Sequence, residues 1–299
     1  MSLFQPLPDF KLTSGGKTLD LSRPKIMGIL NVTPDSFSDG GKFNGVDSAV
    51  KHCEQLLNDG ATIIDIGGES TRPNAKVVST QEELSRVVPV TQAIRKQFGD
   101  DIWLSIDTSN PEVMRAAAAA GADIWNDVRA LTRKGARDMA ATLNIPVMLM
   151  HMRGEPTTMN DFADYHDVVT EVIRELSIQV ETALQAGVRA DNIIIDPGFG
   201  FAKNYQHHCE LLTHLEHFKI FHRPLMFGVS RKRFLAEVLN KSGIAAWQQS
   251  QALERDWVGS AAGLIAIQQG ASIIRTHQVA MMAQAATLWE QLSDCQRSY

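Results

Sequence analysis

The chain has 299 residues, of which 44% are hydrophobic, and its formal net charge is -5. That length suffices for one large domain with a substantial core. The mild negative charge argues against a general nucleic-acid-binding surface, which needs a basic face, but it leaves room for a small basic pocket that binds one anionic metabolite.

Cysteine usage and hydropathy bear on the compartment. Cys53, Cys209 and Cys295 are widely spaced and odd in number, so they suggest neither a metal site nor a disulfide framework, and they favour a reducing compartment. The first twelve residues lack the basic and apolar regions of a signal peptide, and no stretch approaches the roughly 20 apolar residues of a membrane span. We expect a cytoplasmic protein with neither a membrane nor a nucleic-acid partner.

Short apolar runs alternate with helical patterns along the chain. The runs that we interpret as buried strands are residues 26–30, 61–66, 102–106, 123–125, 146–149, 193–195, 225–227 and 272–274. Between them, one helix is expected from Thr80 as N-cap, with Glu83 at capping-box spacing, and another from Pro111. This alternation predicts an α/β fold, a TIM (β/α)8 barrel. An open doubly wound sheet is the alternative, and the count of eight favours the barrel.

The domain organisation follows from this reading. Residues 1–24 precede the first strand and are expected to form an N-terminal extension or hairpin, while a single barrel domain occupies residues 25–299. A polar stretch at residues 241–251, with one glycine and several glutamines, interrupts the helical pattern after the seventh strand. We expect this stretch to be an excursion on the loop that follows that strand.

Polar or ionisable groups follow almost every apolar run at once. These groups at the strand ends are Asn31, Thr71 with Arg72, Asp107, Asn126, Asp196, Lys232, and Arg275 with His277. Each has a structural alternative: Asp107 could cap a helix, Asn126 could hold a turn, and Asp196 could form an Asx-turn. In a barrel, however, all strand carboxyl ends meet at one mouth, where catalytic residues sit. Because a buried unpaired carboxylate is costly, the set predicts a ligand site.

The residue types indicate which ligand would fit. Two aspartates and one asparagine suit a flat heterocycle with a guanidine-like edge, such as a pterin. Met150 and Phe201 could cover such a ring, although packing in the core is the commoner role of such side chains. Arg275 and His277 follow the eighth strand, where these barrels often bind phosphate.

The seventh strand is followed by Ser230, which could cap a helix whose N-terminus attracts an anion. Lys232 would lie in the first turn of that helix, where a cation opposes the dipole, so a functional lysine is indicated. His151 and His166 show no ligand spacing. We interpret His151 and His166 as structural and His207 with His208 as a solvated pair.

Several motifs resemble those of the dihydropteroate synthase family, in the family's order and across nearly the whole chain. They are Asn-Val-Thr-Pro-Asp-Ser-Phe-Ser-Asp-Gly-Gly (31–41), Gly-Gly-Glu-Ser-Thr-Arg-Pro (67–73), Ser-Ile-Asp-Thr (105–108), Asn-Asp (126–127), Met-His-Met (150–152), and residues 196–203, 228–232 and 275–277. The first two are long and highly specific. The resemblance implies a TIM barrel that condenses 6-hydroxymethyl-7,8-dihydropterin diphosphate with p-aminobenzoate to give 7,8-dihydropteroate and diphosphate.

The resemblance also implies roles for individual residues. The pterin would be held by Asp107, Asn126, Asp196, Lys232 and Met150, with Gly228 lining the substrate site. The diphosphate and Mg²⁺ would be held by Asn31, Arg275 and His277, with Asn31 nearest the metal. Two mobile loops would contribute Phe37, Asp39, Thr71, Arg72 and Pro73. The p-aminobenzoate would be received by Phe201, Ser230 and Pro73.

Alternatives and departures accompany this reading. A pterin-binding methyltransferase barrel holds a folate with a similar Asp-Asn-Asp set but uses a corrinoid partner. A non-catalytic paralogue acting as a binding protein would be expected to lose loop or anion-binding residues. Gln278 stands where the family usually has an aspartate after the histidine, which would weaken an acceptor for His277. The family resemblance also implies a homodimer.

Overall fold

The computed structural model describes residues 4–33, 42–69, 78–248 and 250–297. Its strands are β1 (Lys11–Ser14), β2 (Lys17–Asp20), β3 (Lys25–Asn31), β4 (Ile63–Gly67), β5 (Trp103–Asp107), β6 (Ile124–Asp127), β7 (Val147–Met150), β8 (Ile193–Asp196), β9 (Met226–Phe227) and β10 (Ile273–Thr276). Its α-helices are α1 (Lys42–Asn58), α2 (Thr80–Phe98), α3 (Pro111–Ala119), α4 (Ala136–Leu143), α5 (Val168–Gln185), α6 (Tyr205–Thr213), α7 (Arg233–Asn240), α8 (Asp256–Gln268) and α9 (Val279–Arg297). Short 3-10 helices are η2 (Met159–Phe162), η3 (Ala190–Asn192), η4 (Leu215–Phe221), η5 (Ala245–Trp247) and η6 (Leu253–Arg255).

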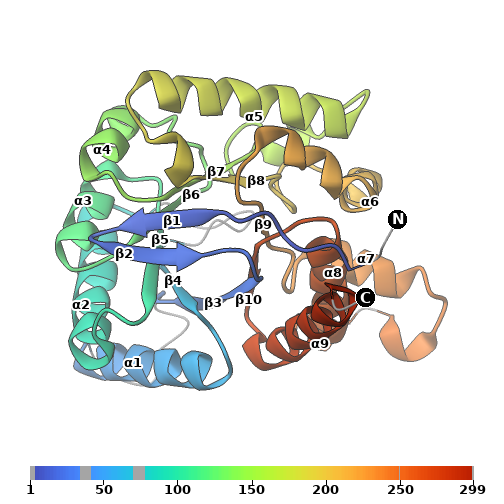
Figure 1. Ribbon diagram of the computed structural model, residues 1–299, viewed down its shortest axis with the longest axis horizontal. Helices are drawn as coiled ribbons and strands as arrows, with labels where there is room; N and C mark the ends of the chain where they lie inside the picture. The colour runs from blue at the N-terminus through green and yellow to red at the C-terminus, as the bar shows by residue number, and fades with distance from the viewer. Residues whose placement is uncertain (1–3, 34–41, 70–77, 249, 298–299) are drawn as a thin grey trace.

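Strands β3 to β10 form one parallel sheet that closes on itself (Figure 1). The strand order is β8-β7-β6-β5-β4-β3-β10-β9, and every pairing in it is parallel. A parallel bridge between Ile195 of β8 and Leu225, just before β9, joins the two ends of the sheet. The TIM barrel predicted from the sequence is therefore confirmed, and the open doubly wound sheet is excluded.

The barrel strands are buried on both faces, because helices cover the outside and side chains fill the inside. Every residue of β4 to β8 is buried. Ile64 and Leu104 belong to the cluster that includes the helical residues Val87 and Val113, whereas the neighbouring Ile63 belongs to a separate cluster. This double burial explains why the strands appear in the sequence as continuous apolar runs.

The residues before the barrel form an antiparallel hairpin, β1–β2, that lies across the amino ends of the barrel strands (Figure 1). Leu12, Leu19 and Leu21 of this segment are buried in one cluster with Met27 and with Ile63, the first residue of β4. The hairpin thus packs against the amino end of the barrel and leaves the carboxyl ends of the strands as the face on which a site can form. No helix in the described ranges is both long and apolar enough to span a membrane.

The start of α2 differs from the expected one by one residue, whereas α3 begins at Pro111 as expected. The N-cap of α2 is Ser79, whose Oγ accepts a hydrogen bond from the Glu82 amide at 3.3 Å, so the expectation that Thr80 is the cap was wrong. Glu83 is buried against the loop that follows β4, close to Gly68, because this face of α2 packs inward. The cap of α3 is Asn110, whose Oδ1 accepts from the Glu112 amide, so that helix does not need Asp107 as its cap.

Strand register brings four positions into one row at the carboxyl ends. Asn31 pairs with Gly67, Gly67 with Asp107, and Asp107 with Asn126, across β3, β4, β5 and β6. Residues in register on neighbouring strands face the same side of the sheet. The glycine leaves the row open at its second position, where an added Cβ would lie 3.6 Å from Asn31 Oδ1 and 3.7 Å from Asp107 Cβ. Register therefore places an amide, a carboxylate and a second amide side by side.

Candidate active site

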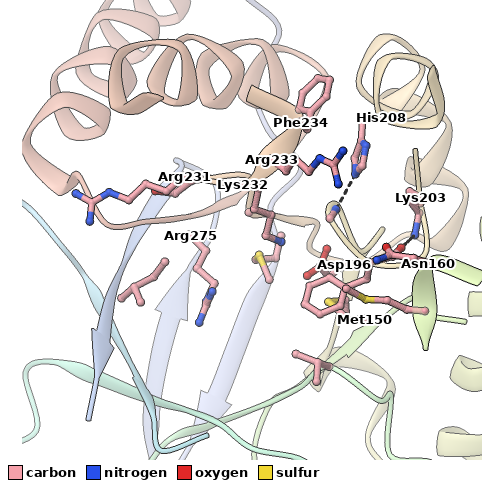
Figure 2. Close-up of a pocket in the computed structure, with 18 of the residues that line it drawn as sticks. Met150, Asn160, Asp196, Lys203, His208, Arg231, Lys232, Arg233, Phe234 and Arg275 are labelled. Carbon is pink, nitrogen blue, oxygen red and sulfur yellow. Dashed lines mark hydrogen bonds between the residues drawn. The ribbon is translucent and has the colours of Figure 1, made fainter. Parts of the chain in front are cut away.

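A cavity of about 1270 Å³ opens at the carboxyl ends of the barrel strands. Figure 2 shows residues from β7, β8, α7 and β10 converging on it. The predicted site residues that line it are Asn31, Asp107, Asn126, Met150, Asp196, Phe201, Gly228, Ser230, Lys232, Arg275 and His277. The predicted residues Phe37, Asp39, Thr71, Arg72 and Pro73 lie outside the described residues. Side chains from distant parts of the sequence thus share one cavity.

An ion-paired cluster forms one part of the cavity floor. Arg275 Nε donates to Asp65 Oδ2 at 2.6 Å, and Arg275 Nη2 donates to Asp107 Oδ2 at 2.8 Å. Asn126 Nδ2 donates to the same oxygen of Asp65 at 3.1 Å. Asp65 is fully buried in β4, and its Oδ1 has no hydrogen-bond partner among the described residues. One carboxylate therefore orients both Arg275 and Asn126.

Asp65 was missed in the sequence analysis because it lies within an apolar strand rather than after one. The signal was nevertheless present, since a single charged residue inside the run Ile63-Ile64-Asp65-Ile66 has to be paired when the strand is buried. Its position two residues before Gly67 puts it on the same face as the row that includes Asn31 and Asp107.

Burial shifts the titration of the charged groups at the site. Burial raises the pKa of Asp107 to about 7, although the neighbouring Arg275 opposes this shift. Burial also raises the pKa of Asp196, with Lys232 as the main opposing charge, and lowers the pKa of Lys232 to about 8. Carboxylates in such surroundings gain from a ligand that brings N–H donors to them.

Asp196 forms a local turn and also lies at the cavity. Its Oδ1 accepts a hydrogen bond from the Gly198 amide at 2.8 Å, which is the Asx-turn, and its side chain also lines the cavity. Met150 pairs with Asp196 in the register of β7 and β8, and it packs with Phe201 in a small apolar cluster. Lys232 Nζ lies 4.8 Å from the centre of the Phe201 ring and donates to the Phe199 carbonyl. A carboxylate, an ammonium group and an apolar wall are thus adjacent.

Ser230 has a different role from the predicted helix cap. Its Oγ accepts a hydrogen bond from the His277 amide at 3.1 Å and lies 3.0 Å from His277 Nδ1. Helix α7 begins at Arg233, with Lys232 as its N-cap residue and without a side-chain cap. The cap prediction was therefore wrong. The hydroxyl group instead orients His277. Gln278 was expected to weaken an acceptor for this histidine, and Ser230 contacts it directly.

Two histidines expected in solvent are buried. His207 and His208 lie in the first turn of α6. His208 Nε2 accepts from the Gly200 amide at 2.7 Å, and its ring stacks on Phe234 of α7 at 5.0 Å. Burial lowers the pKa of His208 to about 3, so the ring is neutral. The solvated-pair interpretation was wrong, because packing against another helix is not visible in a local sequence pattern.

Within the described part of the chain, few side chains at the cavity could hold a metal ion. The described residues contain no group of three or more His, Cys, Asp or Glu side chains that could bind a metal ion. Asn31 is half-buried at the cavity, and the nearby Asp65 and Asp107 are already paired with Arg275. This donor set suits a hard cation that arrives with its own phosphate oxygens and takes one amide oxygen from the protein.

Comparison with known proteins agrees with the fold and identifies the family. The family model described as pterin binding enzyme matches residues 27–277. The chain is 48% identical to dihydropteroate synthase of Escherichia coli (strain K12) over 280 residues, which cover 94% of this chain and 95% of the relative. The solved dihydropteroate synthase of Xanthomonas albilineans with 4-aminobenzoic acid is 44% identical and superposes with a TM-score of 0.87 over 95% of this chain and 98% of its own. The same enzyme in complex with 7,8-dihydropteroate superposes with a TM-score of 0.82, at 41% identity, over 94% of this chain and 98% of its own. The chain belongs to the dihydropteroate synthase family of pterin-binding enzymes.

Proposed function

We propose that this protein condenses 6-hydroxymethyl-7,8-dihydropterin diphosphate with p-aminobenzoate, giving 7,8-dihydropteroate and diphosphate. The observation that carries the proposal is that Asp107, Asn126 and Asp196 share one cavity with Arg275 and His277. The first three can accept from and donate to a heterocycle edge, and the last two can bind an anion. The solved relatives that contain 4-aminobenzoic acid and 7,8-dihydropteroate support the same amine substrate and the same product.

The reaction replaces a carbon–oxygen bond by a carbon–nitrogen bond at the pterin methylene. In our proposal Asp196, Asn126 and Asp107 fix the ring, while Arg275 and His277 stabilise the negative charge of the departing diphosphate. The aniline nitrogen is already unprotonated at neutral pH, so it attacks the methylene directly as the nucleophile, and the proton that it then loses passes to water or to the departing diphosphate. Phe201 and Ser230, together with residues of the two loops, would hold the p-aminobenzoate in line.

Mg²⁺ forms part of the proposal as a companion of the diphosphate. Asn31 would hold it through its amide oxygen, and the bound ion would neutralise part of the diphosphate charge. Arg275 and His277 would still bind the remaining anionic oxygens directly. We also place the reaction in the cytoplasm, in keeping with three cysteines, Cys53, Cys209 and Cys295, that form no disulfide.

Asn31→Ala tests the assignment of the metal. We expect the Mg²⁺ concentration that gives half-maximal activity to rise by about tenfold, because the ion loses the Asn31 amide oxygen but keeps the diphosphate oxygens. Titrating Mg²⁺ into wild-type and variant enzyme measures this value. The matched control is Asn144→Ala, at the C-cap of α4, which should leave the Mg²⁺ requirement unchanged. An unchanged requirement in Asn31→Ala would rule out this ligand.

The expected homodimer has a candidate surface on α8 and α9. Trp257 and Ile265 are exposed two turns apart on α8, and Leu288 is exposed on the adjoining α9. Large apolar side chains at this spacing suit a second copy of the chain. We therefore expect Trp257→Glu to shift the protein to monomers in sedimentation analysis, whereas Ile178→Glu, at an exposed position on α5, leaves the dimer intact. A wild-type protein that is monomeric at micromolar concentration contradicts this expectation.

A direct assay separates the proposed reaction from the alternatives. Diphosphate release from dihydropterin diphosphate should depend on added p-aminobenzoate and should yield dihydropteroate. A binding protein without activity would release none. A methyltransferase would instead require a corrinoid. Release without p-aminobenzoate, or none in its presence, would refute the proposed function.

A further inference from the structure

A buried lysine supports the loop that contains Phe201. Lys203 lies near the end of the segment between β8 and α6, and only 7% of its surface is exposed. Its Nζ lies 3.1 Å from the Gly198 carbonyl oxygen, 3.0 Å from the Phe201 carbonyl oxygen and 2.9 Å from His151 Nδ1. An ammonium group has three N–H donors and no acceptor, so these three contacts match its capacity. The lysine also lines the cavity, and its three contacts close the Gly198–Phe201 turn.

This turn is held in one conformation by its backbone. Gly198 and Gly200 have φ angles of +72° and +84°, and Ala202 has a φ of +48°. A Cβ at Gly198 would lie 1.9 Å from the His151 carbonyl oxygen, so the turn passes directly over the end of β7. Two backbone carbonyl groups of this tight turn, those of Gly198 and Phe201, accept hydrogen bonds from Lys203 Nζ. Buried carbonyl groups need such partners, and the lysine provides them.

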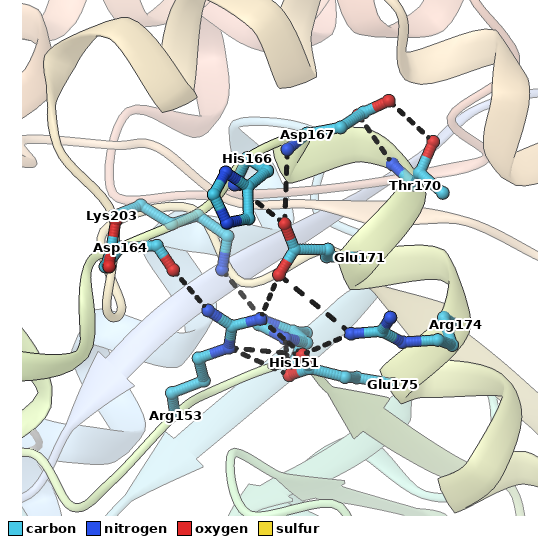
Figure 3. Close-up of polar contacts among 10 residues, drawn as sticks. All are labelled: His151, Arg153, Asp164, His166, Asp167, Thr170, Glu171, Arg174, Glu175 and Lys203. Atoms are coloured by element: carbon cyan, nitrogen blue, oxygen red, sulfur yellow. Dashed lines mark hydrogen bonds and ion pairs between the residues drawn. The ribbon is translucent and has the colours of Figure 1, made fainter.

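His151 connects this lysine to helix α5. Burial lowers the pKa of His151 to about 4, so the ring is neutral, with Nδ1 accepting from Lys203 and Nε2–H donating to Glu175 Oε2 at 3.0 Å. Arg153 in turn bonds to Glu175 and Glu171 (Figure 3). The chain of contacts runs from the loop, through the strand end, to a helix on the outside of the barrel. The site roles proposed above use none of these groups.

We propose that Lys203 is a positioning residue that sets the place of Phe201, and with it the p-aminobenzoate subsite. The inference rests on the proposed function. Phe201 is held at two points, since Lys232 lies over its ring and Lys203 Nζ donates to its main-chain carbonyl. The backbone of Asp196 is held differently from that of Phe201, because Asp196 belongs to β8 and its main-chain oxygen accepts from the His151 amide. Loss of the lysine should therefore displace the aromatic residue more than the carboxylate.

Lys203→Met is the main test, because methionine keeps the length and apolar stem of lysine but removes all three donors. We expect the KM for p-aminobenzoate to rise by about tenfold, while the Kd for dihydropterin diphosphate stays within about twofold. Lys219→Met, at an exposed position on η4, is the matched control and should change neither constant. Equal losses for both substrates, or a lower melting temperature with an unchanged KM, would overturn the inference.

A second variant keeps the inference testable if Lys203→Met does not fold. His151→Leu leaves the lysine in place without its third acceptor, and we expect the same selective rise in KM, smaller in size. His151→Asn retains an acceptor oxygen near the position of Nδ1 and should restore most of the wild-type KM. A His151→Leu enzyme with wild-type KM would contradict the role. A wild-type protein without p-aminobenzoate-dependent diphosphate release would instead refute the proposed function, so the two failures are distinguishable.

The pH dependence gives an independent measurement. Burial lowers the pKa of Lys203 to about 7, and the charged groups that face it are Asp196, Lys232, Arg153 and Glu175. Above that pH the neutral amine keeps two N–H donors and loses one of its three contacts. The KM of the wild type for p-aminobenzoate should therefore rise as the pH increases through the pKa of Lys203. Lys203→Met should lack this step. A step of equal size in the variant would assign it to another group and contradict the inference.

Discussion

Asp196→Ala is expected to abolish measurable binding of dihydropterin diphosphate, with a loss of about 1000-fold, or about 4 kcal/mol. The carboxylate is buried at the cavity wall, and burial raises its pKa, so a ring that brings N–H donors gains a charge-assisted pair there. Alanine would leave those donors without an acceptor, which is more costly than a lost contact at a surface. Isothermal titration of the ligand into each variant measures the effect.

Two companion variants separate ligand binding from folding. Asp196→Asn keeps an oxygen that can accept from the Gly198 amide, so it preserves the turn while removing the charge. It should bind weakly and remain folded by circular dichroism. Asp191→Asn, at an exposed aspartate paired with Arg189, is the matched control and should bind like the wild type. Full binding by Asp196→Ala would refute the role assigned to this carboxylate.

Arg275→Lys is expected to lower kcat/KM for dihydropterin diphosphate by about 100-fold, or about 3 kcal/mol. The guanidinium bonds to Asp65 through Nε and to Asp107 through Nη2, and a single ammonium group cannot span both carboxylates in this way. The variant keeps the charge but loses its fixed direction toward the diphosphate. Steady-state kinetics with dihydropterin diphosphate as the varied substrate measures the loss.

The loss in Arg275→Lys should be specific to ligands that contain the diphosphate group. Binding of a dihydropterin that lacks the diphosphate should change much less in Arg275→Lys, because the ring contacts remain. Asp65→Asn should reproduce part of the kinetic loss, since the Asp65 carboxylate accepts from Arg275 Nε and orients the guanidinium group. Arg189→Lys, in an exposed ion pair, serves as the control. A wild-type kcat/KM in Arg275→Lys would remove this residue from the leaving-group site.

Much of the site could be predicted from the rule that parallel strands in a barrel present their carboxyl ends on one face. Asn31, Asp107 and Asn126 each follow an apolar run, and the register places them in one row. Asp196 and Arg275 follow later runs and line the same cavity. Chain order and hydrophobic pattern were sufficient for this step, because the barrel geometry fixes which strand ends meet.

The features that were missed depend on contacts between distant elements. Asp65 was read as part of a strand, and only the strand order shows that it faces Arg275, because β4 and β10 both pair with β3. Ser230 looked like a helix cap, but its hydroxyl group bonds to His277, 47 residues later in the chain. His208 looked solvated, yet α7 covers it. Local sequence patterns predict where strands end and where helices lie, whereas tertiary packing determines which side chains contact each other.

Helix boundaries were also only partly predictable from the local sequence pattern. Helix α4 was not anticipated, because its N-cap is Gly135 and offers no side-chain capping signal. Helix α6 begins at Tyr205 behind the Asn204 cap, whereas the apolar period alone predicts a helix over roughly Cys209 to Phe218. In both cases the backbone is set by the neighbouring loop as much as by the helix sequence.

A crystal structure of the protein with bound dihydropterin diphosphate tests the division of the cavity most directly. We expect the ring edge within hydrogen-bonding distance of the residue-196 carboxylate and the terminal phosphates beside the guanidinium of residue 275. A ligand bound the other way round, with its phosphates against the carboxylate and its ring over the guanidinium, would contradict the mechanism proposed here.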